Sequence, residues 1–263
     1  SLFLRVFLFS APSGQTYPDA RPHILAQAQH KEGLILKEQA FNLYRDIAER
    51  TDGDVYIGVV GPVRTGKSTL ISRLMQELVL AGMAPGPKRE RLTDELPQSG
   101  SGKTIMTTQP KFVPSEAVTV TLGDQATVRV RMVDSVGYLV DGALGTEEEG
   151  AARMVHTPWF DYDIPFEQAA EIGTRKVIAD HATIGLVVTT DGSIADLPRD
   201  AYADPEERVV RELKQLGKPF IMVLNSRHPE EETTEKLRGR LSERYAVPVM
   251  ALNVKEMSLA DIL

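Results

Sequence analysis

The segment Gly61–Ser68, which reads GPVRTGKS, constrains the fold of this chain more than any other feature. It matches the pattern G-x-x-x-x-G-K-[S/T], which requires a strand before it and a helix after it. Residues 54–60 are mostly apolar and rich in β-branched side chains, which predicts a buried strand. Residues 67–80 carry apolar side chains at helical spacing. The strand–loop–helix order therefore predicts a phosphate-binding loop.

The residue types in this loop suit a nucleoside triphosphate. Glycines let successive backbone N–H groups turn toward one anion, and the helix starting near Lys67 points its positive end at the same charge. Lys67 is expected to bridge the β- and γ-phosphates, and the Ser68 hydroxyl to coordinate Mg²⁺. Arg64 could reach phosphate charge, as an arginine finger does, or remain a solvated loop residue. The expected nucleotide contacts in this region are Gly61, Pro62, Val63, Arg64, Thr65, Gly66, Lys67, Ser68 and Thr69.

An acidic residue is expected at the end of a second strand, where it would hold the water shell of the metal. Residues 126–133 alternate between polar and apolar side chains, which predicts a strand with one solvent-exposed face. Asp134 follows this strand directly. Gly137 completes a D-x-x-G spacing, so we expect its backbone amide to meet the γ-phosphate. The alternative interpretation of Asp134 is a turn-capping aspartate, because Asp and Gly are both common in turns.

Two threonines within residues 102–110 stand just before the predicted strand that begins at Lys111. In GTPase-type hydrolases a threonine at this place closes a switch loop on Mg²⁺ and the γ-phosphate. The sequence does not decide between Thr107 and Thr108, and both could simply be strand-entry residues. The expected catalytic residues are Lys67, Asp134, Thr107 and Thr108, and the expected metal ligands are Ser68, Thr108 and Asp134.

Two positions depart from the usual GTPase pattern. Tyr138 follows Gly137, where many GTPases carry a glutamine that orients the attacking water, so hydrolysis is expected to be slow or to borrow a group from elsewhere. Residues 225–228 read NSRH, which keeps an asparagine but lacks the lysine and the aspartate of the guanine-recognition motif. Without that carboxylate two hydrogen bonds to guanine are lost. We therefore expect ATP rather than GTP, with Asn225 as a further nucleotide contact.

The rest of the chain predicts a layered α/β fold. Strand patterns around 111–113 with 118–122, and at 126–133, have Gly123-Asp124 between them and predict an antiparallel hairpin. From residue 166 onward helical and strand patterns alternate, which predicts parallel strands covered on both faces. We therefore expect a three-layer α/β/α P-loop NTPase with a mostly parallel six-stranded sheet and one antiparallel strand. Helices are expected at 166–180, 205–216 and 230–245, strands at 183–189, 219–224 and 247–252, and long loops at 82–102 and 137–165.

Residues 1–36 show no period, and we expect an irregular or non-native leader there, followed by a helix at 37–50 and one P-loop domain over 37–263. The net charge of −7 argues against a nucleic-acid partner, which would favour a basic face. The absence of cysteine excludes disulfides and thiolate metal sites. No apolar run reaches the roughly 18 residues of a membrane span, so no transmembrane segment is expected.

Long stretches of this sequence resemble the spore-coat morphogenetic ATPases, the stage IV sporulation protein A family. The resemblance covers about residues 41–263. It rests on the phosphate loop and on residues 46–51, 94–99, 102–108, 171–176 and 217–222. It implies a fold like that of the translation-factor GTPases, with ATP in place of GTP as the nucleotide. It also implies that Lys67 is the phosphate-loop lysine, Asp134 the metal-side acid, and Thr107 with Thr108 the sensor threonines.

The resemblance also implies a cellular role. Members of the family couple ATP hydrolysis to self-association into a polymer, the basement layer of the spore coat. That layer lies at the forespore surface in the mother-cell cytoplasm, where a small amphipathic membrane peptide tethers it and other coat proteins join it. Family members continue into further domains beyond the region that matches here.

Three functions compete at this point. The leading hypothesis is an ATPase that assembles on hydrolysis. A GTPase is the alternative enzyme, which would require another group to replace the missing aspartate. A nucleotide-binding scaffold without turnover is the third, made plausible by the absent glutamine. Base preference separates the first two, and phosphate release separates both from the third.

Overall fold

The computed structural model describes residues 54–97, 109–122, 126–143, 145–148, 150–195 and 197–262. The expected leader at 1–36, the helix at 37–50, and the residues Thr107 and Thr108 lie outside the described residues, as does the Gly123-Asp124 turn. In the described part of the chain, no helix has both the length and the apolar character needed to cross a membrane.

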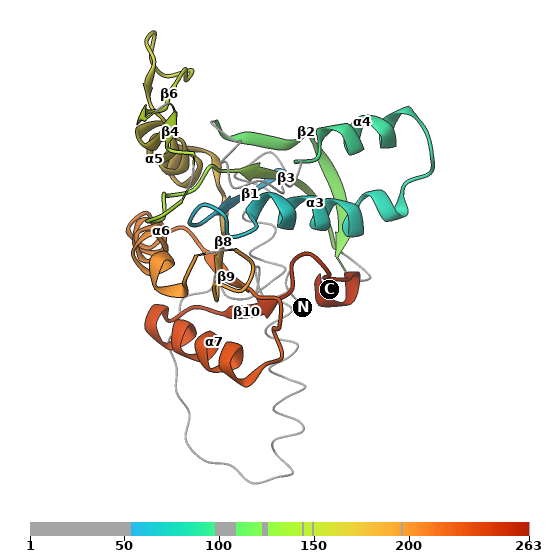
Figure 1. The fold of residues 1–263 in the computed structure, drawn as a ribbon. Coiled ribbons are helices and arrows are strands. Elements are labelled where there is room, and N and C mark those ends of the chain that lie inside the picture. The colour runs from blue at the N-terminus through green and yellow to red at the C-terminus, as the bar shows by residue number, and fades with distance from the viewer. Residues whose placement is uncertain are drawn as a thin grey trace.

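Six strands form one sheet in the order β10-β9-β8-β1-β3-β2 (Figure 1). β2 is antiparallel to β3, and the other neighbouring pairs are parallel. This confirms the predicted mostly parallel sheet with one antiparallel strand. The strands are β1 Asp54–Val60, β2 Lys111–Leu122, β3 Ala126–Asp134, β8 Ile184–Thr190, β9 Phe220–Asn225 and β10 Val249–Leu252.

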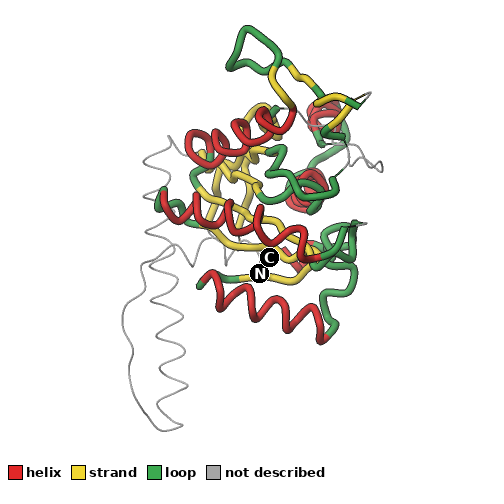
Figure 2. The backbone as a smooth tube through the Cα atoms, turned by 60° about the vertical axis from the view of Figure 1, so that its left-hand side comes forward, coloured by secondary structure: helices red, strands yellow, loops and turns green. Residues whose placement is uncertain are grey.

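Helices cover both faces of the sheet, which makes the three predicted layers (Figure 2). On one face, Leu70, Ile71 and Leu74 of α3 (Lys67–Leu78) pack against apolar residues of the sheet, and Ile262 of α8 (Leu259–Ile262) joins the same core. On the other face, the cluster of Val209, Leu213 and their neighbours fills the space between the sheet and the helices α6 (Ala203–Gln215) and α7 (Glu232–Tyr245). The helices are α3 Lys67–Leu78, α4 Pro87–Glu95, α5 Phe166–Lys176, α6 Ala203–Gln215, α7 Glu232–Tyr245 and α8 Leu259–Ile262.

Two expected loops contain regular structure. The glycine- and proline-rich segment 82–102 holds helix α4, which begins at Pro87 and buries a single apolar side chain, Leu92. Residues 137–165 form two short hairpins, which project from one end of the molecule in Figures 1 and 2. Their strands are β4 Glu147–Glu148, β5 Ala151–Ala152, β6 Met154–Val155 and β7 Ile164–Pro165.

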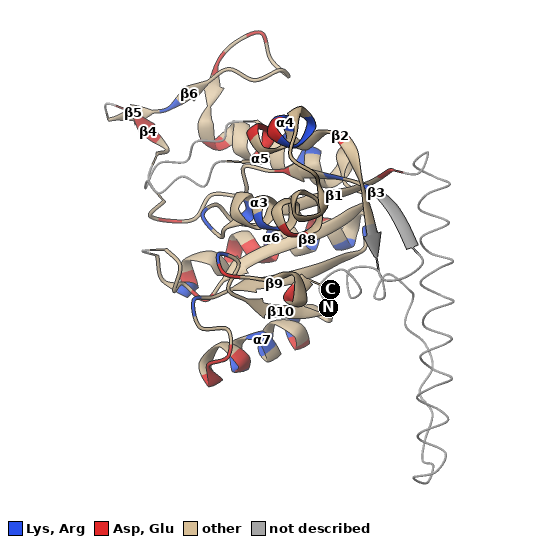
Figure 3. Cartoon of the chain, turned by 90° about the vertical axis from the view of Figure 1, so that its right-hand side faces the viewer, with Lys and Arg blue, Asp and Glu red and all other residues tan. Residues whose placement is uncertain are grey.

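Acidic and basic residues are interspersed along α4 and α7 (Figure 3). Several of them form ion pairs within one helix, including Lys236 with Glu232 at 2.6 Å and Arg91 with Glu95 at 4.0 Å. Mixed charge of this kind is typical of a solvated helix face.

The sheet topology brings four chain segments to one edge. β1, β3, β8 and β9 are neighbours and run in the same direction, so their carboxyl ends lie together. Val59 of β1 is in register with Asp134 of β3, and Thr190 of β8 with Asn225 of β9. In open α/β sheets this edge is where ligands bind.

Candidate nucleotide-binding site

The loop between β1 and α3 has a backbone that requires glycine at two places. Gly61 and Gly66 have φ angles of 142° and 92°. A Cβ atom at Gly61 would lie 2.1 Å from the Val188 carbonyl oxygen, and one at Gly66 would lie 2.4 Å from Nδ2 of Asn225. Arg64 also adopts a positive φ, 62°, without being glycine. This left-handed turn is the backbone form that aims successive N–H groups at an anion.

Lys67, the first residue of α3, is buried beneath this loop. Its Nζ donates a 2.6 Å hydrogen bond to the Pro62 carbonyl. Burial lowers the pKa of Lys67 to about 8, and the nearby Asp134 carboxylate opposes that shift. A buried ammonium with one carbonyl partner retains capacity for anionic oxygens, because it carries three N–H donors.

Ser68 and Asp134 meet across the sheet edge. The Ser68 hydroxyl donates a 2.7 Å hydrogen bond to Oδ2 of Asp134, a residue that is 3% exposed. Oδ1 of the same carboxylate is buried without a hydrogen-bond partner. Burial raises the pKa of Asp134, whereas Ser68 and Lys67 lower it. A hydroxyl beside a carboxylate with a free lone pair is the oxygen donor set that suits hydrated Mg²⁺, so these two residues could hold the metal.

Gly137, three residues after Asp134, lies directly beside the loop. A Cβ atom at Gly137 would be 2.5 Å from Nζ of Lys67 and 2.4 Å from the Gly61 carbonyl oxygen. Its φ of 99° also favours glycine. In the structure its backbone N–H donates a 3.0 Å hydrogen bond to Oγ1 of Thr174 on α5. The amide expected to meet a γ-phosphate therefore has a protein acceptor here.

Tyr138 does not point into the site. Its ring is buried, its hydroxyl donates a 2.5 Å hydrogen bond to Glu212 of α6, and the Arg208 guanidinium lies 4.1 Å from the ring centre. Burial raises the pKa of the Tyr138 hydroxyl, and Glu212 raises it further. The Tyr138 backbone carbonyl accepts a 2.8 Å hydrogen bond from the Val63 amide, which ties this segment to the phosphate loop. Tyr138 therefore acts as an anchor rather than as a substitute for a water-orienting glutamine.

Asn225 braces the phosphate loop. Its Nδ2 donates to the Thr65 carbonyl at 3.0 Å, and its Oδ1 accepts from the Val254 amide at 3.2 Å. The side chain was predicted to contact the nucleotide, and both of these bonds go to the protein backbone. The next residue, Ser226, is buried and donates a 2.6 Å hydrogen bond to Asp191 after β8. Ser226 and His228 stand at the lysine and aspartate positions of the guanine-recognition motif, and His228 is exposed.

Three further predicted contacts, Arg64, Thr65 and Thr69, lie in the phosphate loop and the first turn of α3. Arg64 is half-buried. Burial raises the pKa of the Tyr202 hydroxyl, and the positive charge of Arg64 opposes part of that shift. Thr65 is fully buried, and its hydroxyl donates to the Pro62 carbonyl at 3.0 Å. Thr69 is half-buried in the first turn of α3.

Sequence reasoning did not identify three contacts that shape this site. They are Thr174 with Gly137, Asn225 with Thr65, and Tyr138 with Glu212. Each joins residues that are 37 or more positions apart in the chain. No local pattern marks such pairs, because only the packed fold brings them together.

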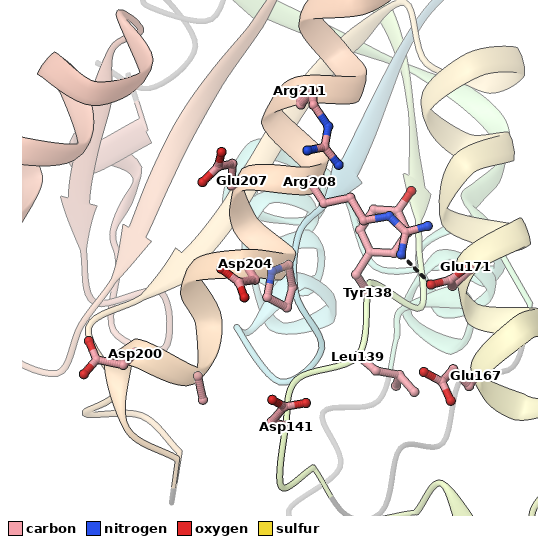
Figure 4. Close-up of a pocket in the computed structure, with 12 residues that line it drawn as sticks. Tyr138, Leu139, Asp141, Glu167, Glu171, Asp200, Asp204, Glu207, Arg208 and Arg211 are labelled. Atoms are coloured by element: carbon pink, nitrogen blue, oxygen red, sulfur yellow. Dashed lines mark hydrogen bonds and ion pairs between the residues drawn. The ribbon is translucent and has the colours of Figure 1, made fainter.

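A separate pocket of about 510 Å³ lies between α5 and α6 (Figure 4). In that view Arg208 extends over Tyr138 toward Glu171, to which it is hydrogen-bonded. The pocket lining does not include the phosphate loop, Lys67 or Asp134. Tyr138 is the one lining residue next to the D-x-x-G segment, so the pocket is a neighbour of the candidate site and not part of it.

The comparisons with known proteins agree with this geometry. Residues 38–263 match the family model described as stage IV sporulation protein A, ATPase domain. The chain is 57% identical over 221 residues to stage IV sporulation protein A of Clostridioides difficile, which covers 84% of this chain and 45% of that protein. It is 55% identical over 222 residues to the protein of the same name from Bacillus subtilis, with the same coverage. The chain therefore spans about half the length of these relatives.

A more distant relative is the GTPase Der of Mycobacterium marinum. It is 26% identical over 177 residues, which is 65% of this chain and 37% of that protein. Together with the sheet order and the loop geometry, these matches identify the fold as that of a P-loop NTPase.

Proposed function

The chain belongs to the stage IV sporulation protein A ATPase family, and from that premise we propose that it binds ATP with Mg²⁺ at the edge formed by β1 and β3 and hydrolyses it. The single observation that carries the proposal is the arrangement of Lys67, Ser68 and Asp134. A buried ammonium lies under a positive-φ loop, and a hydroxyl–carboxylate pair with an unpaired oxygen lies beside it.

Each of these groups has a role in the proposed reaction. The loop amides and Lys67 bind the β- and γ-phosphates, and Ser68 with Asp134 orients the metal and its water shell. Mg²⁺, when bound, neutralises charge that develops on the phosphate oxygens. Water attacks the γ-phosphorus, the bond to the bridging oxygen breaks, and ADP and phosphate leave. Thr107 and Thr108 are proposed to sense the γ-phosphate.

ATP is proposed over GTP because of the residues around Asn225. The side chain of Asn225 is occupied by Thr65 and Val254, and the following Ser226 is turned toward Asp191. No carboxylate follows within residues 226–228 to pair with the guanine edge. Titration calorimetry with ATP and with GTP tests this choice. Tighter binding of GTP would favour a GTPase, consistent with the relationship to Der.

A nucleotide-binding scaffold is favoured by one observation, the burial of Tyr138 at the position where a glutamine would orient water. Slow or absent turnover by this chain, with ATP still bound, would support that alternative. We favour slow hydrolysis, because Lys67 and the metal-side pair are both present.

We further propose, from the resemblance given in the sequence analysis, that hydrolysis drives self-association at the forespore surface in the mother cell, with coat proteins and a small membrane peptide as partners. The projecting hairpins expose Met154 and Tyr162, which are 51% and 63% exposed and are candidates for such a contact. Sedimentation of the chain with ATP and with ADP tests this part. Sedimentation that does not depend on the nucleotide would contradict it.

A further inference from the structure

One hydrogen bond connects the phosphate side of the molecule to the opposite helical layer. The Gly137 N–H donates to Oγ1 of Thr174 at 3.0 Å, and both groups are buried. Thr174 is fully buried on α5, whereas Lys67 Nζ lies close to Gly137 on the side where a Cβ would stand. The amide therefore has Thr174 as its acceptor, while Lys67, which is proposed to bind the γ-phosphate, lies close to the same glycine.

From this contact, and resting on the proposed ATP binding, we infer that Thr174 is a positioning residue that competes with the γ-phosphate for the Gly137 amide. One N–H carries a single hydrogen, so it cannot make a strong, well-aligned hydrogen bond to both acceptors at once. Contact with the γ-phosphate requires the peptide between Val136 and Gly137 to turn, which breaks the bond to Thr174. ADP has no γ-phosphate and leaves that bond in place.

The local chemistry allows the exchange. Gly137 has no Cβ, so the backbone can adopt either orientation even though Lys67 and Gly61 lie close by. The Thr174 hydroxyl can donate to the Ala170 carbonyl one helical turn earlier in both arrangements, as threonines in helices often do, so release of the Gly137 amide leaves only an acceptor lone pair of that hydroxyl unused. Both arrangements therefore satisfy the groups involved, which a two-state element requires.

A chain of contacts links Gly137 to the helices at the surface. Gly137 is followed by Tyr138, which is held on α6 by Glu212 and Arg208, and Arg208 in turn reaches Glu171 on α5 (Figure 4). A turn of the Gly137 peptide would therefore shift Tyr138 and its contacts with α5 and α6, the two helices that border the pocket in Figure 4. Binding of the γ-phosphate would thus change the α5–α6 surface through the contacts of Tyr138 with Glu212 and Arg208.

Thr174→Val tests the inference, because valine keeps the shape and removes the acceptor. The Gly137 amide would then be buried without a partner unless the γ-phosphate takes it. We expect affinity for an imido analogue of ATP to rise about tenfold, while affinity for ADP stays within about twofold of wild type. Thr174→Ser keeps the hydroxyl and is the matched control, with affinities close to wild type.

A purely structural role predicts a different result. If Thr174→Val changes the affinities for the analogue and for ADP equally, or changes neither, the competition is wrong although ATP binding stands. If the wild-type chain binds neither nucleotide, the proposed function fails, and the inference fails with it.

A second measurement needs no variant, in case Thr174→Val does not fold. Val60-Gly61 and Val136-Gly137 are the two Val-Gly steps in the sequence. Labelling valine carbonyls with ¹³C and glycine amides with ¹⁵N therefore gives two NMR signals, both from the candidate site. We expect the Gly137 signal to move between the ADP and analogue complexes. An unchanged Gly137 signal would overturn the inference.

Discussion

Ser68 donates a 2.7 Å hydrogen bond to Asp134, and this bond joins the first turn of α3 to the end of β3. The neighbouring strands β1 and β3 are parallel and in register at this edge, so the pair follows from the sheet topology. The second carboxylate oxygen of Asp134 is left without a partner in a buried position. Buried acceptors of this kind are rare, and here the position suits a hydrated cation.

Asp134→Asn tests that role. The amide can still accept from Ser68 but carries no charge, so we expect the Mg²⁺-dependent part of ATP affinity to fall about 10–100-fold. The fold should be kept, because a neutral group costs less to bury than the carboxylate whose pKa is raised there. Calorimetry with and without Mg²⁺ measures the effect.

The matched control for that experiment is Asp191→Asn. Asp191 lies at the same sheet edge but is held by Ser193 and Ser226, so its substitution should leave the Mg²⁺ dependence intact. A wild-type Mg²⁺ response in Asp134→Asn would remove Asp134 from the metal site.

Lys67 gives the site a pH dependence. Its pKa is lowered to about 8 by burial, and only the charged ammonium attracts phosphate. ATP affinity should therefore be nearly constant below pH 7.5 and fall about tenfold by pH 9, as the free protein loses this proton. In Lys67→Arg, whatever its absolute affinity, the guanidinium stays charged and the fall should disappear. A fall that persists in Lys67→Arg would assign the titration to another group.

Asn225→Ala should loosen the phosphate loop. The substitution leaves the Val254 amide and the Thr65 carbonyl without their partners, so we expect a loss of about 2–3 kcal/mol in the free energy of unfolding. ATP affinity should fall as well, since the loop is no longer held in its binding form. Denaturant unfolding and calorimetry measure the two effects. An unchanged stability would mean that Asn225 does not brace the loop.

Tyr138 is predicted to act in stability rather than in catalysis. Tyr138→Phe loses the hydrogen bond to Glu212 and should cost about 1–2 kcal/mol in unfolding free energy, with phosphate release unchanged. Tyr138→Gln should destabilise more, by about 3 kcal/mol, because it empties a buried ring position. Faster phosphate release in Tyr138→Gln would contradict this account, since it would mean that the side chain reaches the attacking water.

The sequence predicted the elements whose signals are local. β1 and the start of α3 were placed because an apolar run, the G-K-S sequence and a helical period adjoin one another. Asp134 was placed because a strand pattern ends beside a D-x-x-G spacing. The sheet type followed from the alternation of strand and helix patterns after residue 166, since that alternation requires parallel crossovers.

The misses have physical causes. α4 buries only Leu92 and is otherwise charged, so it has no apolar stripe to reveal it, although Pro87 at its start is a typical first residue. The strands β4–β7 have two residues each, too few for a period. The partners Thr174 and Asn225 act through contacts made by tertiary packing, and neither residue type signals such a contact by itself.

The central claim is that this chain hydrolyses ATP through Lys67, and phosphate release from ATP and from GTP, with Mg²⁺, measures it most directly. We predict release from ATP by the wild-type chain, much less from GTP, and none above background for Lys67→Ala. Equal release by Lys67→Ala, or a clear preference for GTP, would contradict the account.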